Sequence, residues 1–409
     1  VSQVRELSGV KSLELDQPMS LFAQEYQSPT PSWGLDRIDQ RTAVGAGDSY
    51  TAIFGYNSAG AGATIYIGDT GISAHDDLAG RISQVGFTGF NDGFGPLDCN
   101  GHGTHVATTA AGTNYGIAKR ATVVPIKLLN CAGSGSYSTV IAGLDWILSD
   151  QNTNQKAGSV LNLSIGGGFS PALNEAVAKL TSAGITVVVA AGNSNRDACA
   201  TSPASAPSAI TVGAISSSDA KAGFSNWGSC LDIHAPGVNI NAGWVGSPSA
   251  TKAIQGTSMA APHVTGAVAV FLGLNPGASV ATVTEYINAQ ATVGAIANLD
   301  ATTPNKLLYV SPTDGGPAPV ITPVTPAPAP VPPAPLPSVL TVESATLVTS
   351  YSAQLNGSAI ANTNQLPIYF VTSTDPEFKT NSQTSAAGTA GGSTKLTFSY
   401  NLSLLKPET

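Results

Sequence analysis

The stretch SVLNLSIGGGFSPALNEAVAKLTSAGITVVVAAGN, residues 159–193, contains the unit from which the fold can be predicted. Two short apolar runs rich in β-branched residues, 159–165 and 184–192, flank a segment of helical periodicity at 171–184. That segment begins with proline and ends with glycine, as helices commonly do. A strand, a helix and a second strand in this order predict two parallel strands joined by a right-handed crossover.

The same alternation continues on both sides of this unit. Residues 63–69, 121–129 and 209–215 form further strand-like runs, and residues 137–150 have the pattern of a helix. We therefore predict an α/β fold with a central, mostly parallel sheet and helices on both faces. In such sheets ligand-binding groups gather at the carboxyl ends of the strands, so candidate site residues are sought there.

Composition excludes several classes of partner. The 409 residues include 17 basic and 25 acidic side chains, a formal net charge of −8, and only 10% are charged. An acidic surface disfavours nucleic acid and anionic membranes as partners. No apolar run reaches the roughly 18 residues of a membrane-spanning helix, so we expect no span.

The two ends of the chain differ from its middle. The first residues, VSQVRELSGV, contain neither an initiating methionine nor an apolar signal core, so we expect a fragment without its leader. The proline-dense, uncharged run that ends at Pro337 predicts an extended spacer over 312–337. Residues 338–409 alternate apolar and polar positions and predict a partial antiparallel β-sandwich with too few strands to close.

Asp69 follows the strand in ATIYIGDTGI, residues 63–72, and could act as a carboxylate at the sheet edge or simply as a turn residue. Aspartic proteases also use a DTG motif, but their chemistry needs two facing carboxylates. This chain contains no second DTG or DSG, so that interpretation is disfavoured.

His102 and His105 lie three residues apart in NGHGTHVA, residues 100–107. On a helix they would share a face, so a zinc site is physically possible. The helical zinc signature, however, spaces its histidines at i and i+4 with a glutamate between them, and no such glutamate occurs here.

Ser258 stands at the start of a long apolar segment in QGTSMAAPHV, residues 255–264. A serine there is either a helix cap or a nucleophile close to free N–H groups. Asn193 follows a buried strand and is either a turn residue or a donor to an oxyanion. The local sequence leaves both pairs of alternatives open.

The motifs DTGI, NGHGTHVA, AAGN and GTSMAAPHV, in this order, resemble those of the subtilisin-like serine proteases, peptidase family S8, and within them the proteinase K branch. The similarity covers about residues 28–311 and implies a secreted serine endopeptidase with a three-layer fold. It implies that Ser258 is the nucleophile, His102 the general base and Asp69 its orienting carboxylate, with Asn193 and the Ser258 N–H as oxyanion donors. His105 would then be a structural neighbour.

The resemblance also implies how substrate binds. Two segments would pair with an extended peptide as added strands. They comprise Gly133, Ser134, Gly135 and Tyr137, and Ser164, Ile165 and Gly166. The latter, with Ala190, Ala191 and Gly192, would form a wide, uncharged P1 pocket, so we expect broad specificity for protein and peptide substrates with an aromatic or aliphatic preference.

Structural calcium, and no catalytic metal, is a further implication, because oxygen ligands suit a hard cation. The first site would use the carbonyls of Pro207 and Ala209 and the carboxylate of Asp232. A second site would use Asp36, Asp39 and Gln40, with Asp48 as the one candidate from a loop that departs from the family pattern. The alternative for either is a solvated acidic turn.

Four cysteines, Cys99, Cys131, Cys199 and Cys230, allow three pairings or four free thiols, and their even number suits an oxidising compartment. The resemblance implies that Cys99 pairs with Cys131 and Cys199 with Cys230.

It also implies that residues 1–27 are the remnant of an inhibitory prosegment, with the mature enzyme, a monomer, beginning near Ser28. Residues 338–409 resemble an incomplete fibronectin type III domain.

Two departures from the family pattern could lower activity. Gly68 replaces a branched apolar residue and could loosen its strand, and Thr108 replaces a glycine and could crowd its helix.

A catalytically silent binding protein with the C-terminal module as its working part is the rival hypothesis. The retention of Asp69, His102, Asn193 and Ser258 together disfavours it. The third hypothesis is a metal-dependent hydrolase that uses His102 and His105.

Overall fold

The computed structural model describes residues 25–41, 51, 53–56, 59–154 and 158–311, together with five strands between residues 339 and 403. Residues 1–24 of the predicted prosegment and the predicted linker 312–337 lie outside the described residues. The chain divides into two compact units, Val1–Ala318 and Pro319–Thr409, which are treated separately.

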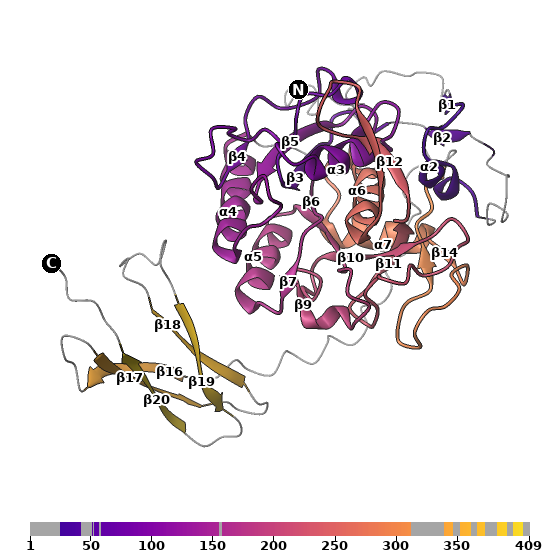
Figure 1. Ribbon diagram of the computed structural model, residues 1–409. Helices are drawn as coiled ribbons and strands as arrows, with labels where there is room; N and C mark the ends of the chain where they lie inside the picture. The colour runs from indigo at the N-terminus through magenta and orange to yellow at the C-terminus, as the bar shows by residue number, and fades with distance from the viewer. Residues whose placement is uncertain are drawn as a thin grey trace, which may run out of the picture. The chain divides into compact units, whose positions relative to one another are not determined.

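A nine-stranded sheet forms the centre of the first unit (Figure 1). Every neighbouring pair in it is parallel except the pair at one edge, β14 with β15. In spatial order the strands are β14 (Thr292–Val293), β15 (Lys306–Leu307), β11 (Ile233–Pro236), β10 (Ile210–Ile215), β8 (Thr186–Ala190), β6 (Ser159–Leu163), β3 (Thr64–Asp69), β5 (Thr122–Lys127) and β4 (Phe87–Thr88). The predicted mostly parallel sheet is confirmed.

Helices cover both faces of this sheet, which confirms the predicted three layers (Figure 1). The helices α4 (Tyr137–Asn154) and α5 (Pro171–Ser182) share one apolar cluster with the sheet. The second cluster contains α2 (Trp33–Ile38), α3 (His102–Ala111), α6 (Thr257–Leu274) and α7 (Val280–Gln290). Alternate residues of a strand enter opposite clusters because side chains alternate across a sheet: Val188 of β8 belongs to the α6 side, and Val187 to the α4 side.

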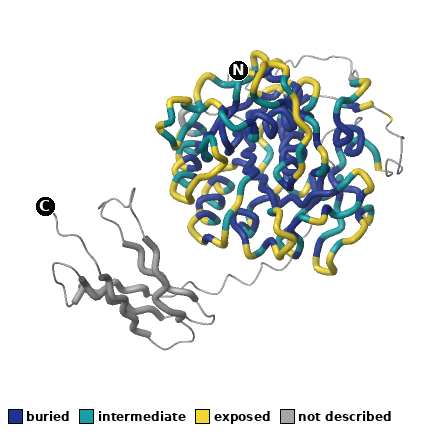
Figure 2. Tube along the Cα trace, in the orientation of Figure 1, coloured by how far each residue is buried: buried dark blue, intermediate teal, exposed yellow. Residues whose placement is uncertain are grey.

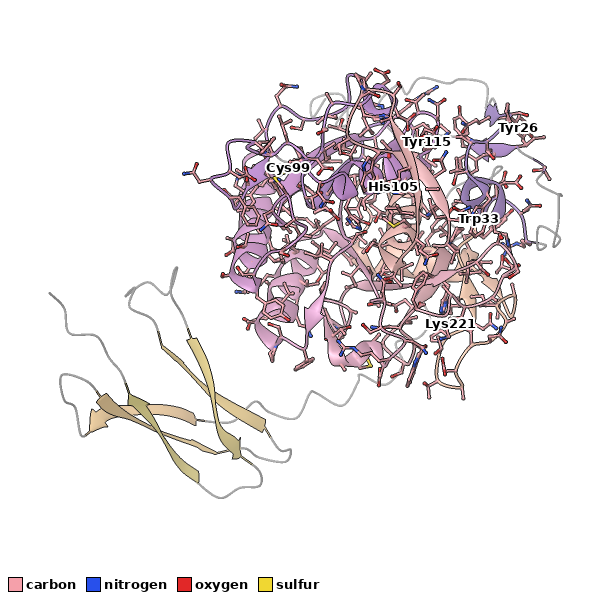
Figure 3. All side chains as sticks on the ribbon, in the orientation of Figure 1. Tyr26, Trp33, Cys99, His105, Tyr115 and Lys221 are labelled. Atoms are coloured by element: carbon pink, nitrogen blue, oxygen red, sulfur yellow. A yellow bond between two sulfur atoms is a disulfide. The ribbon has the colours of Figure 1, made fainter. Side chains whose placement is uncertain are left out.

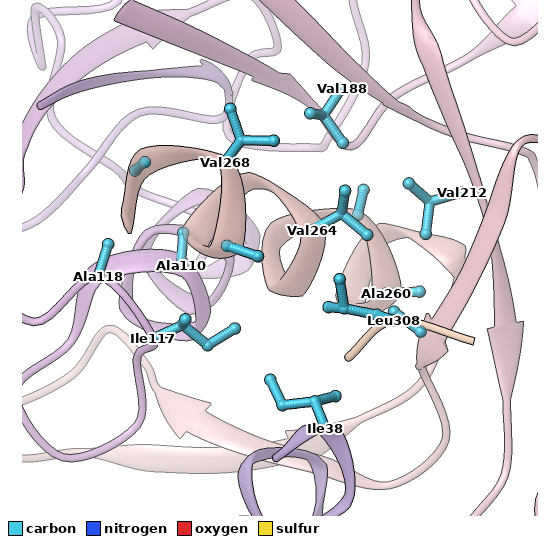
Figure 4. Close-up of a cluster of buried hydrophobic side chains, with 14 of the residues drawn as sticks. Ile38, Ala110, Ile117, Ala118, Val188, Val212, Ala260, Val264, Val268 and Leu308 are labelled. Carbon is cyan, nitrogen blue, oxygen red and sulfur yellow. The ribbon is translucent and has the colours of Figure 1, made fainter. Parts of the chain in front are cut away.

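Helix α6 runs through the core of the unit. Its Val264 and Val268 lie against Val188 and Val212 of the sheet (Figure 4). By length and composition α6 could cross a membrane, but 78% of its apolar window is buried inside the protein (Figure 2). That burial is typical of a core helix.

Neither departure from the family pattern disturbs the packing. Strand β3 is paired through Gly68 on both sides, with Ile126 and with Leu163. A Cβ at Gly68 would lie 2.6 Å from Leu163 Cδ2, so a neighbouring leucine fills the space. The buried Thr108 hydroxyl accepts the N–H of Gly243, 2.9 Å away, and so ties α3 to β12. The expected loosening and crowding are absent from this part of the described chain.

Smaller elements surround the sheet. Two antiparallel pairs are β12 (Ile240–Gly243) with β13 (Thr251–Ile254) and β7 (Gly167–Gly168) with β9 (Thr201–Ser202), and two short 3-10 helices are η1 (Asp76–Leu78) and η2 (Ala198–Ala200). Strand β1 (Glu25–Gln27) pairs with β2 (Phe54–Tyr56), so the last three residues of the predicted prosegment lie within the folded unit. The boundary at Ser28 stays a prediction.

The cysteines form two disulfides, Cys99–Cys131 and Cys199–Cys230. This is the neighbour pairing that the family resemblance implied, and it excludes four free thiols. Cys99 (labelled in Figure 3) precedes α3, so its bridge ties the histidine loop to the segment after β5.

In the second unit five strands form two antiparallel sheets. One has the order β16 (Val339–Thr346), β17 (Ser352–Ile360), β20 (Leu396–Ser403), and the other pairs β18 (Leu366–Thr372) with β19 (Gln383–Ala390). The antiparallel arrangement agrees with the alternating sequence pattern. The assignment to the fibronectin type III class remains a prediction.

Candidate active site

The buried carboxylate of Asp69 stands at the carboxyl end of β3, an interior strand that is the third from one edge of the sheet. Its Oδ1 accepts two hydrogen bonds of 2.8 Å, one from the Thr70 N–H and one from Nδ1 of His102. The local sequence therefore places a carboxylate against an imidazole at the sheet edge where ligand groups gather.

His102 is the first residue of α3, and a second buried carboxylate holds that helix end. Asp98 is 5% exposed and accepts five hydrogen bonds around the start of α3. The donors are the Thr70 hydroxyl, the N–H groups of Asn100, Gly101 and Thr104, and the Thr104 hydroxyl. Sequence analysis missed Asp98, although an aspartate just ahead of a helix start is a recognised capping signal.

The environment of His102 favours its protonated form. Burial of the ring opposes protonation, but the charge and hydrogen bond of Asp69, with the charge of Asp98, outweigh that effect and raise the pKa of His102. Because Nδ1 faces Asp69, the bond fixes Nε2 as the position that can take up a proton.

His105 faces a different environment from His102. Its ring is fully buried between α3 and the β12–β13 hairpin (Figure 3), where Nε2 bonds the carbonyls of Ile240 and Lys252 at 3.0 and 3.1 Å. Burial lowers the pKa of His105 to about 4. The two imidazoles therefore do not form a metal site, and His105 is a structural residue, as the resemblance implied.

Ser258 lies in the first turn of α6, where its hydroxyl donates to the carbonyl of Ser164 at 3.0 Å. The Ser164 hydroxyl returns a bond of 2.8 Å to the Ser258 carbonyl. Among the hydrogen bonds of the described residues, none joins the Ser258 hydroxyl to His102. Catalytic hydrogen bonds often tighten only when substrate binds.

Asn193 follows β8, and its amide is oriented by Thr257. The oxygen Oδ1 accepts both the N–H and the hydroxyl of Thr257 at 2.8 Å, so Nδ2 remains as a donor. A Cβ at Gly256, whose φ is +154°, would lie 3.3 Å from Asn193 Nδ2 and 3.6 Å from Ser258 N. Glycine thus leaves open the space beside two nitrogen atoms, Asn193 Nδ2 and Ser258 N.

Three hollows share the segment after β6 as a wall. The first, of about 180 Å³, is lined by Asn193, Ser258 and the small residues 190–192. The second is lined by His102 and residues 133–135. Both contain Ser164, Ile165 and Gly166, so the hollow that contains the histidine and the hollow that contains the serine adjoin at this segment. The third is mostly apolar and includes Leu129, Tyr137, Val140 and Leu173.

Residues 60–310 match the family model described as the subtilase family, peptidase S8. The chain belongs to the subtilase family. It is 48% identical over 310 residues to an extracellular serine proteinase of Thermus sp. (strain Rt41A), which covers 76% of this chain and 72% of the relative. It is 44% identical over 304 residues to a cuticle-degrading serine protease of Arthrobotrys oligospora, covering 73% and 72%.

A solved structure agrees with these sequence matches. The crystal structure of a cold adapted subtilisin-like serine proteinase superimposes on this subtilase with a TM-score of 0.63 and 44% sequence identity. The match covers 69% of this chain and 99% of the other. The subtilisin-like fold predicted from four motifs is therefore confirmed.

The lining of the first hollow includes a charged residue that the sequence prediction of an uncharged P1 pocket did not contain. Arg196 contributes to its lining, beside the expected small residues Ala190, Ala191 and Gly192. Sequence analysis missed Arg196 because it lies in the loop after Asn193, three residues beyond the AAGN motif.

The predicted peptide-binding segments are brought together, but not all of their backbone is available. Asn130 engages the N–H groups of Gly133 and Ser134 and the carbonyl of Ser134 in a turn. Among the backbone hydrogen bonds of the described residues none involves Gly135, so both of its backbone groups remain for a partner. Tyr137 links the two segments through a 2.8 Å bond to the Gly168 carbonyl.

The predicted calcium ligands occur in two places. Asp232 lies beside β10, where Oδ2 accepts the Thr211 N–H at 2.8 Å, and its other oxygen has no partner among the described residues. Ala209 directly precedes β10, and Pro207 lies in the turn before it. A carboxylate oxygen and backbone carbonyls are the kinds of ligand that calcium accepts.

The second set is less available for a metal. Both oxygens of Asp36 accept bonds from residues 51 and 53. Asp39 accepts the Gly55 N–H, and burial raises its pKa to about 6. Gln40 donates to the Asp36 carbonyl, and Asp48 lies outside the described residues.

Proposed function

We propose that this subtilase, an extracellular serine endopeptidase, cleaves peptide bonds with Asp69, His102 and Ser258 through an acyl-enzyme. The observation that carries the assignment is the 2.8 Å bond between buried Asp69 and His102, in a hollow that adjoins the one lined by Ser258. This arrangement orients an imidazole so that Nε2 can accept a proton from a nearby hydroxyl.

The reaction would begin when the Ser258 hydroxyl leaves the Ser164 carbonyl and donates to His102 Nε2. Oγ attacks the scissile carbonyl while its proton passes to His102, and the buried Asp69 carboxylate stabilises the imidazolium. His102 then protonates the leaving amine. Water, deprotonated by His102, hydrolyses the acyl-enzyme and restores Ser258.

Asn193 Nδ2 and the Ser258 N–H are proposed to stabilise the oxyanion. The closeness of both nitrogen atoms to the open space at Gly256 supports this role, and the bonds from Thr257 hold the Asn193 amide in place before charge develops. Each such donor contributes about 3 to 4 kcal/mol to transition-state stabilisation.

We propose that an extended peptide binds between Gly135 and residues 164–166 and places its P1 side chain in the first hollow. Small walls suit a broad specificity that includes aromatic and aliphatic residues.

Four further proposals rest on the family resemblance. They are membership of the proteinase K branch, inhibition by the prosegment 1–27, a monomeric state and a fibronectin type III module at 338–409.

Structural calcium is also proposed, held first by Asp232 with the carbonyls of Pro207 and Ala209. Removal of calcium by a chelator is expected to lower the melting temperature before it lowers the initial rate, because none of these groups lines either hollow. Differential scanning calorimetry with chelator, and with calcium restored, measures this. An unchanged melting temperature would contradict the proposal. Asp232→Asn should weaken the calcium response.

The test of the proposed chemistry is active-site labelling during casein hydrolysis. A sulfonyl fluoride should abolish hydrolysis and add one sulfonyl group, which peptide mass mapping places on Ser258, whereas Ser258→Ala should take up no label. A zinc chelator should leave the initial rate unchanged. Hydrolysis that survives the reagent, or stops only with the zinc chelator, would overturn the serine mechanism. Absence of hydrolysis and of label would favour a silent binding protein.

A further inference from the structure

Arg196 is the one charged residue in the described lining of the first hollow. The rest of that lining is small or neutral, including Ala190, Gly192 and Ala204. Because a cation beside small walls recognises a different side chain from an uncharged pocket, Arg196 bears directly on specificity.

The backbone of Arg196 is fixed while its side chain is not engaged. Its N–H donates to Asn226 Oδ1 at 3.2 Å, and its carbonyl accepts the Trp227 N–H at 3.1 Å. Within the described residues the guanidinium forms neither a hydrogen bond nor an ion pair. The neighbouring Asp197 carboxylate instead accepts the Cys199 N–H at 2.9 Å.

The neutral polar side chains of the lining are largely occupied by the protein itself. Asn226 bonds the Ala191 carbonyl at 2.8 Å through Nδ2, and its Oδ1 accepts two backbone N–H groups. The Thr201 hydroxyl donates to the Ala198 carbonyl, and Ser202 is bonded to Ser170. Arg196 is therefore the residue of this lining that can offer a ligand charged donors not already engaged by the described protein.

We propose that Arg196 extends the P1 specificity of this subtilase to side chains that end in a carboxylate, with glutamate accepted beside aromatic and aliphatic residues. The inference rests on the proposed function, which makes this hollow the P1 site. A guanidinium offers a carboxylate two parallel N–H donors, and charge-assisted bonds of this kind are stronger than neutral ones. Since Arg196 is exposed, solvent and salt limit the gain.

The test uses chromogenic peptides that are identical except for Glu, Gln or Phe at P1. The variant Arg196→Gln should lower kcat/KM for the Glu peptide about threefold relative to the Gln and Phe peptides. Salt raised to about 0.5 M should reduce the wild-type preference for Glu over Gln. Lys179→Gln is the matched control, because Lys179 is an exposed cation on α5 outside the lining and should leave the ratio unchanged.

The outcomes separate this inference from the function on which it rests. If Arg196→Gln leaves the ratio of kcat/KM for the Glu and Phe peptides unchanged and the Phe peptide is cleaved normally, only the proposed role of Arg196 is overturned. An equal fall in Lys179→Gln would assign the effect to the general field of the protein and also overturn it. If no peptide is cleaved and Ser258 takes up no sulfonyl label, the proposed function fails and the inference with it.

Discussion

Replacing Ser258 with alanine is expected to lower kcat for a P1 Phe peptide by about 10⁶, the loss found for the nucleophile of subtilisin. Without Oγ no acyl-enzyme forms, and the remaining donors, Asn193 Nδ2 and the residue 258 N–H, act only on direct attack by water. The fold should be retained, because the Ser258 hydroxyl makes one hydrogen bond in the structure, to Ser164. Steady-state kinetics and the melting temperature measure the two parts of this prediction.

The neighbouring Ser164 provides a matched control. Its hydroxyl bonds the Ser258 carbonyl and the Asn162 amide but is not proposed to react. Ser164→Ala should therefore lower kcat by about tenfold or less, the effect of losing a hydrogen bond. If Ser258→Ala retained more than about 1% of the wild-type rate, another group would have to be the nucleophile. If Ser164→Ala were as inactive as Ser258→Ala, packing would account for the loss.

The sequence predicted the sheet where its strands are buried. The five predicted strands, β3, β5, β6, β8 and β10, are buried on both faces apart from Thr122 at the start of β5, because helices cover both sides of the sheet, and such largely apolar runs are recognisable in a sequence. Strand β11, IHAP, was not predicted, since it has four residues and includes a histidine and a proline. It forms because β10 provides a parallel edge, a tertiary effect.

The family resemblance implied different roles for the two histidines, and the structure supplies the physical reason, which their spacing does not. His102 and His105 are three residues apart on one helix, which by spacing alone puts them on one face. His102, however, is the first helical residue after Gly101, whose φ is +112°, and its ring meets Asp69. His105 lies three residues further along the helix, and its Nε2 hydrogen-bonds the Ile240 carbonyl of β12. Position along the helix distinguished them.

The residues that sequence reasoning missed act through distant partners. Asp98 could have been found as a cap, but its bond to Thr70 joins positions 28 residues apart. Arg196 has no local signal, because Asn226, 30 residues later, fixes its place beside the first hollow. A sequence pattern that spans only a few neighbouring residues cannot indicate contacts between residues this far apart in the chain.

Replacing Asp69 with alanine is expected to lower kcat by about 10⁴, a hundredfold less than the loss of Ser258. The imidazole then loses the bond that directs Nδ1 and the charge that stabilises its protonated form. Asp69 raises the pKa of His102, and His102 must be neutral to act as a base. Removing the carboxylate therefore lowers that pKa, so the acid limb of the residual kcat/KM profile should move to lower pH.

Two further variants separate orientation from charge. In Asp69→Asn the amide oxygen can keep both bonds of Oδ1, to Thr70 and to His102, while the charge is lost. A kcat above that of Asp69→Ala, with the same shift of the acid limb, would assign the difference to orientation. Asp98→Asn retains Asp69 and should therefore lower the pKa of His102 less than the two Asp69 variants do. An unchanged acid limb in Asp69→Ala would contradict the triad, because the nearest negative charge would then have no influence on the base.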